Sequence, residues 1–181
     1  MEELKSAEPS SSISIEVEGD TYLDAIKGIM ACQQLDGCQL IYVAATVSAE
    51  SIMQAMELIG IDVSDVRFID CISNMMTGTQ GVKRNVIFIE SPTMLESIML
   101  KIEFIRKKTA KKRVIVVLDS LNTLHIHNDW KILGEFLHIL VNSLRSRGAM
   151  IVILSIKEQQ SQDLNMLLGL VSDRTVRAGG D

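Results

Sequence analysis

The segment at residues 113–124, RVIVVLDSLNTL, constrains the fold more than any other part of the chain. Five apolar residues at 114–118, four of them β-branched, lie between a basic cluster and Asp119. Such a run is typical of a strand that is buried on both faces, at the centre of a parallel sheet with helices above and below it. The strand is followed by the polar side chains Asp119, Ser120 and Asn122. Because ligands of open α/β sheets bind at the carboxyl ends of the strands, we expect any chemistry here.

Strand and helix patterns alternate along the chain. Apolar runs predict strands at 13–18, 39–45, 66–72, 85–90, 114–118, 149–155 and 173–177, and helical spacing predicts helices at 22–34, 48–59, 91–105, 129–147 and within 157–170. A loop is expected at 123–128. This alternation predicts an α/β fold with a mainly parallel sheet covered by helices on both faces. We expect a flexible N-terminal segment at 1–12 and one domain at 13–181.

Composition narrows the classes of function. The net charge of -5 and the aromatic content of 4% argue against a nucleic-acid-binding protein. The N-terminus is acidic and polar, and no apolar run reaches the roughly 18 residues of a membrane span. We therefore expect a cytoplasmic protein without a membrane partner, whose cysteines, Cys32, Cys38 and Cys71, are free thiols.

Several segments, taken in order, resemble those of one family. They are VRFIDCIS at 66–73, NVIFIESPTMLESIMLKI at 85–102, RVIVVLDSLNTLHIHND at 113–129 and FLHILVNSLRSRGAMIVILS at 136–155. With them the chain resembles the RecA/KaiC-like ATPase domains that are common in archaea, within the P-loop NTPase superfamily. The resemblance implies a three-layer αβα RecA-like domain and allows an antiparallel edge strand near the C-terminus. It also makes the strand before Asp119 a Walker B element, whose carboxylate holds Mg²⁺ beside a nucleotide.

The phosphate-binding loop of that family is the first departure. A Walker A loop needs glycines whose N–H groups wrap the phosphates, a lysine for the β- and γ-phosphates, and a Ser or Thr for Mg²⁺. By order along the chain it must lie between the strand at 13–18 and the helix that begins near Tyr22. The sequence there is EVEGDTYLDAIKG, in which Gly19 is the turn's only glycine and no Gly-Lys-Ser/Thr follows. Asp24 would repel a phosphate, so we predict a degenerate Walker A loop.

The second departure concerns the residue that activates water. In the family the strand matching 39–45 is commonly followed by an acidic residue, whereas here Thr46, Val47 and Ser48 follow and the first acid is Glu50. Hydrolysis then lacks both phosphate positioning and a base, so we assign no catalytic residue. Asp119 is either a retained Mg²⁺ ligand or a residue that caps the loop behind it, and we favour the structural interpretation.

The sequence thus predicts a catalytically inactive, regulatory or scaffolding RecA/KaiC-like domain that binds protein and needs no cofactor. Since the family assembles through domain faces, the expected partner is another protein or a second copy. Partner-binding candidates are Trp130, the only tryptophan, and the Met75–Met76 pair in a polar loop. The alternative is an ATP sensor that still holds ATP and Mg²⁺, with Gly19, Asp20, Thr21, Asp119 and Ser120 as binding residues and Asp119 as the metal ligand.

Three further clusters have a structural and a functional interpretation. His125, His127 and Asp129 form a metal site only if the loop is extended. The acids that end neighbouring strands, Asp70, Glu90 and Asp119, are more simply caps than a metal site. The basic segment at 106–113, RKKTAKKR, is either a phosphate or nucleic-acid contact or a solvated turn at a helix C-terminus, where the helix dipole stabilises cations.

Overall fold

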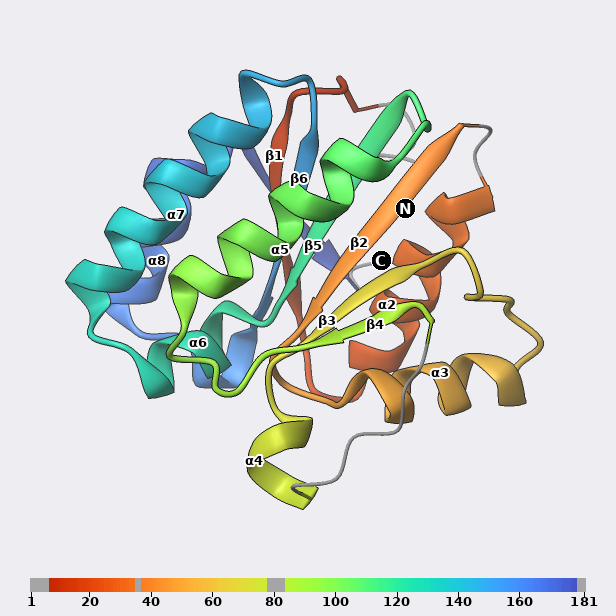
Figure 1. The fold of residues 1–181 in the computed structure, drawn as a ribbon. Helices are drawn as coiled ribbons and strands as arrows, with labels where there is room; N and C mark the ends of the chain where they lie inside the picture. The colour runs from red at the N-terminus through yellow and green to blue at the C-terminus, as the bar shows by residue number, and fades with distance from the viewer. Residues whose placement is uncertain (1–6, 35–36, 78–83, 179–181) are drawn as a thin grey trace.

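The structure is a computed structural model that describes residues 7–34, 37–77 and 84–178, without the side chains at 33, 34, 76 and 77. Its centre is a seven-stranded sheet in the order β4-β3-β2-β5-β6-β1-β7, and every strand pairing is parallel (Figure 1). The strands are β1 (Ser12–Val17), β2 (Cys38–Ala44), β3 (Arg67–Asp70), β4 (Val86–Phe88), β5 (Arg113–Asp119), β6 (Met150–Ile156) and β7 (Arg174–Ala178).

Helices cover both faces of this sheet, which confirms the three-layer αβα architecture (Figure 1). One face carries α2 (Tyr22–Met30) and α3 (Ala49–Leu58), and the opposite face carries α5 (Leu95–Lys108), α6 (Leu121–His127), α7 (Trp130–Arg145) and α8 (Gln162–Val171). The shorter elements are α4 (Ser73–Thr77) and the 3₁₀ segments η1 (Ala31–Gln34) and η2 (Lys157–Gln159).

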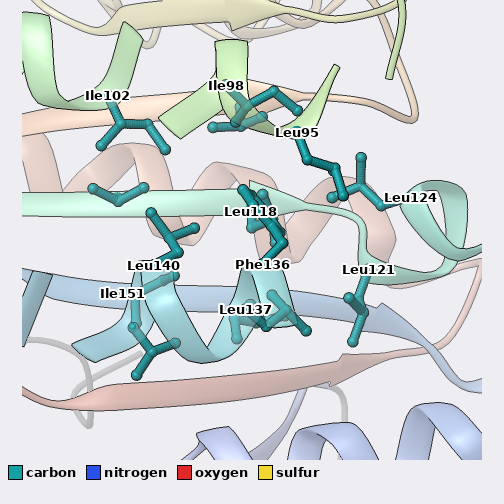
Figure 2. Close-up of a cluster of buried hydrophobic side chains, with 14 of the residues drawn as sticks. Leu95, Ile98, Ile102, Leu118, Leu121, Leu124, Phe136, Leu137, Leu140 and Ile151 are labelled. Atoms are coloured by element: carbon teal, nitrogen blue, oxygen red, sulfur yellow. The ribbon is translucent and has the colours of Figure 1, made fainter. Parts of the chain in front are cut away.

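The core lies in two layers, one on each side of the sheet. Figure 2 shows the layer beneath α5, α6 and α7, where Ile98 and Ile102 of α5 and Leu137 and Leu140 of α7 meet β5 at Leu118. The second layer packs Ile26 and Ile29 of α2 against residues of β1, β2 and β5. Both layers are apolar because alternate residues of each parallel strand point to opposite faces, and both faces are covered.

The strand predicted to organise the chain does lie in the middle of the sheet. β5 pairs with β2 on one side and with β6 on the other, and its residues 114–119 are all buried. In the β2 pairing, Asp119 lies opposite Ala44 at the carboxyl end of both strands. The sequence pattern of β-branched residues followed by an acid therefore located the centre of the fold correctly.

Four local expectations were wrong. The Met75–Met76 pair, expected in a polar loop, lies in the short helix α4. The edge strand β7 pairs with β1 in parallel, not antiparallel. Residues expected to form a loop before Trp130 instead form α6, because Ser120 caps its N-terminus by accepting a hydrogen bond from the Thr123 N–H at 3.4 Å. The helix expected to begin after Ser91 begins at Leu95, because a turn at 91–94 comes first, with the Met94 N–H bonded to the Ser91 carbonyl at 3.0 Å.

The three cysteines are buried free thiols, as predicted. Burial raises the pKa of the Cys71 thiol to about 12, so that this thiol stays protonated near neutral pH. None of the helices in the described part of the chain is both long enough and apolar enough to cross a membrane.

Candidate site at the carboxyl edge of the sheet

The Asp119 carboxylate lies at the centre of the carboxyl edge and is fully buried. Its Oδ2 accepts two phenol hydrogen bonds, from Tyr22 at 2.6 Å and from Tyr42 at 2.5 Å. Tyr42 stands on the neighbouring strand β2, opposite Val117, and its hydroxyl reaches one step further along the same face of the sheet. Tyr22 is the first residue of α2, the helix that follows β1. In the sheet, β6 lies between β1 and β5. One carboxylate oxygen thus joins three elements.

Burial controls the protonation of this group. It raises the pKa of Asp119 to about 6, and the hydrogen bonds from Tyr22 and Tyr42 act in the opposite direction. The pKa values of Tyr22 and Tyr42 are raised well above the ordinary range, first by burial and then by the negative charge of Asp119, so both phenols remain donors. The second oxygen, Oδ1, is buried and has no hydrogen-bond partner among the described residues.

The turn between β1 and α2 contains the residues that the sequence assigns to the phosphate loop. It spans only four residues, Glu18 to Thr21. The turn is closed by its own groups, because the Thr21 N–H and hydroxyl both donate to the Glu18 carbonyl, at 3.0 and 3.1 Å. The Gly19 N–H points outward and donates to the Glu158 carboxylate at 3.1 Å. Gly19, Asp20 and Thr21 are therefore brought together, and Tyr22 connects their turn to Asp119.

Charged side chains from η2 and the sheet edge hold this turn from outside. Glu18 forms an ion pair with Lys157 at 2.5 Å, and Glu16 lies 3.7 Å from Arg177. The hydrogen bond from Gly19 lowers the pKa of Glu158, which is ionised at neutral pH. The Gly19 N–H on the outer side of the turn is thus already hydrogen-bonded to a carboxylate.

Hydroxyl groups fill the space at the end of β2. The Thr46 hydroxyl donates to the Ser120 hydroxyl at 3.0 Å and lies 2.9 Å from that of Thr123. The Thr46 N–H and the Ala45 N–H both donate to the Asp119 carbonyl. Ser120 is therefore next to the predicted ligand Asp119, as the sequence requires, but its hydroxyl serves α6 and Thr46.

The other acids and histidines do not form a metal centre. Asp70 is buried and accepts hydrogen bonds from the N–H groups of Ala49, Ile72 and Ser73 and from the Ser73 hydroxyl, so it caps the starts of two helices. Glu90 is exposed. His125 and His127 lie two apart on helix α6, where side chains at this spacing do not face each other. The described residues contain no cluster of three or more acid, His or Cys side chains suited to a metal.

Sequence reasoning missed the roles of Tyr22, Tyr42 and Asn122. The Asn122 side chain accepts from the Ile156 N–H at 2.7 Å and donates to the carbonyls of Ile156 and Gln159, at 3.2 and 3.0 Å. It therefore ties the end of β6 to the start of α6. The signal that could have found Tyr42 is its place inside an apolar strand, because a buried phenol almost always has a hydrogen-bond partner.

The predicted partner-binding residues lie at the surface where they are described. Trp130 at the start of α7 is 40% exposed, and the exposed residues Ile126 of α6, at 72%, and Ile132 of α7, at 58%, lie close to it in sequence. Met75 on α4 is 56% exposed, and the Met76 side chain lies outside the described residues. Their role in binding a partner stays a prediction.

Comparison with known proteins identifies the family of this fold. Residues 25–174 match the family model "ATPase: KaiC", which is most of the chain. The chain belongs to the KaiC family of ATPases. The matched region of this KaiC-family domain begins within α2, after the turn that contains Gly19. No curated protein matches the sequence.

Solved structures agree with the fold at low sequence identity. A KaiC-like protein, PH0186 from the hyperthermophilic archaeon Pyrococcus horikoshii OT3, aligns with a TM-score of 0.64 and 12% identity over 93% of this chain and 70% of its own. The protein PH0250, also from P. horikoshii OT3, aligns with a TM-score of 0.67 and 12% identity over 98% of this chain and 86% of its own. Together with the family match, these likenesses support the three-layer αβα fold of RecA/KaiC-like ATPases.

Proposed function

We propose that this KaiC-family domain is a pseudo-ATPase that acts as a regulatory or scaffolding protein-binding module. The observation that carries the proposal is the pair of phenol hydrogen bonds on the Asp119 carboxylate. In P-loop NTPases the Asp at this place and a Ser or Thr of the phosphate loop hold Mg²⁺. Here a tyrosine from the corresponding helix start contacts the carboxylate directly.

A magnesium ion does not fit this arrangement. Mg²⁺ requires close oxygen ligands, at about 2.0–2.1 Å, in octahedral geometry. Oδ2 is occupied by two O–H donors, and Oδ1 is buried. Tyr22 would have to leave before an ion and its waters could enter, so we assign no Mg²⁺ to Asp119.

The turn before α2 does not fit a phosphate either. A phosphate cradle needs several N–H groups that converge on one anion, together with a lysine. The turn at 18–21 is closed by Thr21, and its glycine N–H is matched by the Glu158 carboxylate. The turn itself carries Glu18 and Asp20, and Glu16 precedes it in β1. Negative side chains in and beside the turn disfavour a triphosphate.

Water activation has no obvious agent. Thr46 and Ser48 follow β2, and the nearest buried acid on the neighbouring strand β3, Asp70, is used in four hydrogen bonds as a cap. Without a metal, a phosphate cradle and a base, phosphoryl transfer lacks the positioning and charge stabilisation on which it depends.

Thermal unfolding with and without Mg-ATP tests the loss of nucleotide binding. A ligand at about a hundredfold excess over its Kd would add about 2.7 kcal/mol of stability. Each kcal/mol raises the Tm of a domain of this size by about 2–4 °C. We expect no Mg²⁺-dependent shift. A shift that needs Mg²⁺, is absent with ATP and EDTA, and disappears in Asp119→Asn would show that the domain is a nucleotide sensor.

Protein binding is supported by the apolar side chains Ile126, Trp130 and Ile132, which are exposed within seven residues. Exposed aromatic and aliphatic side chains of this kind are typical anchors of interfaces. Because Trp130 is the chain's only tryptophan, its fluorescence reports on this surface alone. If copies associate here, its emission should shift to the blue as protein concentration rises, together with an increase in mass by sedimentation.

A matched pair of variants makes that test specific. Ile126→Asp places a charge in the proposed surface and should keep the protein monomeric. Leu58→Asp changes an equally apolar, 87% exposed residue on α3, on the opposite face of the sheet, and should leave association unchanged. Equal effects of the two variants would contradict a surface at the α6–α7 junction.

A further inference from the structure

A cavity of about 510 Å³ lies at the opposite, amino edge of the sheet. Its walls come from the first residues of β2 and β3, the chain just before and within β4, the last turn of α5 and the connection to β5. The lining residues used below are Gln39, Arg67, Arg84, Phe104, Lys108 and Lys111. Gln39 is five residues before Ala44, the register partner of Asp119, so the cavity lies about 17 Å along β2 from the tyrosine-bound carboxylate.

Four cations line this cavity, namely Arg67, Arg84, Lys108 and Lys111, and its described lining residues include no acid. Among the described residues none of the four forms an ion pair with a carboxylate. This is unusual in a chain whose net charge is -5. Four like charges around one hollow repel one another, so an anion that entered would relieve that repulsion as well as form contacts.

A solvated helix end explains only part of this cluster. The dipole of α5 stabilises cations in its last turn, which accounts for Lys108. It does not account for Arg67, which opens β3, or for Arg84, which precedes β4. The Arg67 guanidinium lies 3.4 Å from the Arg84 carbonyl and donates to it, so the two arginine segments are joined. Three separate segments therefore bring positive charge to one place.

The base of the cavity is held in place by a chain of hydrogen bonds. The Gln39 amide donates to the Asp65 carbonyl at 3.0 Å and accepts from the Thr109 hydroxyl at 3.2 Å. The Thr109 hydroxyl in turn accepts from the Lys111 N–H at 3.2 Å. The backbone of Lys111 is thus tied to the same network as the start of β2. The cavity is preformed, which lowers the ordering cost of binding.

An apolar wall accompanies the charges. Ile87, Phe104 and Ile105 line the same cavity, and the Lys108 ammonium lies 4.2 Å from the centre of the Phe104 ring. Small-molecule sites combine such apolar walls with a few polar groups, in volumes of about 300–1,000 Å³. An inorganic anion would not use the apolar wall. The positive charge of the lining side chains excludes a metal cation.

We propose that this cavity binds a small phosphorylated molecule of about mononucleotide size. Its phosphates would contact Arg67, Arg84, Lys108 and Lys111, and its apolar or aromatic part would lie against Ile87 and the side of Phe104. The site is separate from the carboxyl edge and gives the module a ligand that does not depend on Mg²⁺ or on Asp119.

Calorimetric titration of the whole chain with ADP in EDTA tests this proposal, with thermal unfolding alongside. Pyrophosphate serves as a second probe, and potassium chloride of equal ionic strength as the control. We expect ADP to bind and to raise the Tm beyond the salt control. Loss of one charged contact should raise the Kd about tenfold, so we expect this for Lys108→Gln and Arg67→Gln. Lys107→Gln removes the same charge from the next residue, outside the cavity lining, and should leave the Kd unchanged.

Several results would overturn the proposal. No ADP effect beyond salt, or equal losses in Lys107→Gln and Lys108→Gln, would reduce the cluster to a solvated turn. Pyrophosphate that binds as tightly as ADP would remove the role of the apolar wall. A single-stranded oligonucleotide that binds more tightly than ADP and is lost in the same variants would make nucleic acid the ligand.

The carboxyl edge is tested separately by repeating the titration with Mg²⁺ in place of EDTA. Under our proposal Asp119→Asn leaves ADP binding unchanged. Binding that requires Mg²⁺, fails in Asp119→Asn and persists in Lys108→Gln would instead contradict both this proposal and the pseudo-ATPase assignment. If no probe binds under any condition, only the amino-edge site is lost.

Discussion

Replacing Asp119 by asparagine should stabilise the domain at neutral pH. The ionised carboxylate is buried, and burial is the main cause of its raised pKa. Asparagine has nearly the same shape, and its amide oxygen can accept the hydrogen bonds of both Tyr22 and Tyr42. The substitution therefore removes a buried charge while it keeps both contacts. The asparagine NH₂ group takes the place of Oδ1, which has no hydrogen-bond partner among the described residues. A buried donor without an acceptor lowers stability by the same amount at every pH.

The size of the effect follows from the difference between the two pKa values. The pKa of Asp119 is about 6 in the folded protein, against about 3.9 for an unfolded Asp. At about 1.36 kcal/mol per pKa unit, ionisation costs the folded state about 3 kcal/mol. Below pH ~4 the group is protonated in both states and the cost is absent. As pH rises from about 4 to about 6 the folded state holds more protons than the unfolded state, so stability falls, and above this window the full cost is present.

Urea unfolding of both proteins at a series of pH values between about 4 and 8 measures this cost, since the linear extrapolation gives the free energy of unfolding at each pH. The quantity to compare is the free energy of unfolding of Asp119→Asn minus that of the wild type, because other titrating groups cancel. We expect this difference to rise by about 2 kcal/mol from pH 4 to pH 7, because part of the cost is already present at pH 4. A difference that is independent of pH, or that falls as pH rises, would refute a buried carboxylate with a raised pKa.

Two further substitutions test the contacts around this edge. Tyr22→Phe removes one donor from the Asp119 carboxylate and should lower the free energy of unfolding at pH 7 by about 1–3 kcal/mol. The loss should be smaller at pH 4–5, where the carboxyl group is protonated. An equal loss at both pH values would contradict the charge-assisted bond. Asn122→Ala removes three hydrogen bonds to the η2 and β6 backbone and should cost about 2–4 kcal/mol in urea unfolding, whereas the exposed Asn142→Ala should stay within about 0.5 kcal/mol.

The architecture could be predicted because local patterns and tertiary structure agree. The β-branched run before Asp119 forms the central strand β5, and helices with apolar stripes cover both faces. The parallel pairing of β7 could not be read in the same way. It depends on long-range contacts such as that of the Asp173 carboxylate, which accepts from the Ser12 N–H at 2.8 Å. Residues so distant in sequence leave no local signal.

The carboxyl edge was predicted in location but not in detail. The absence of a Gly-Lys-Ser/Thr motif after Gly19 could be seen directly, whereas the use of Asp119 by Tyr22 could not. Helix periodicity places Tyr22 at the start of α2 but does not indicate which residue its hydroxyl contacts. Helix α6 was missed although Ser120 is a good N-cap residue, because its seven residues are too few to show a clear helical period.

The contact between Tyr22 and Asp119 links the two losses on which the pseudo-ATPase proposal depends. Tyr22 directly follows the four-residue turn, so its bond to Asp119 fixes the first turn of α2 against the centre of the sheet. The turn can open around an anion only if α2 moves away from the sheet. That movement would break the charge-assisted hydrogen bond to the buried carboxylate, and the loss of this bond lowers stability. The same bond occupies the oxygen that a metal ion would need. A single tyrosine thus disfavours phosphate and metal together, and Tyr22→Phe, which loosens the turn without restoring glycines or a lysine, should not by itself create Mg-ATP binding.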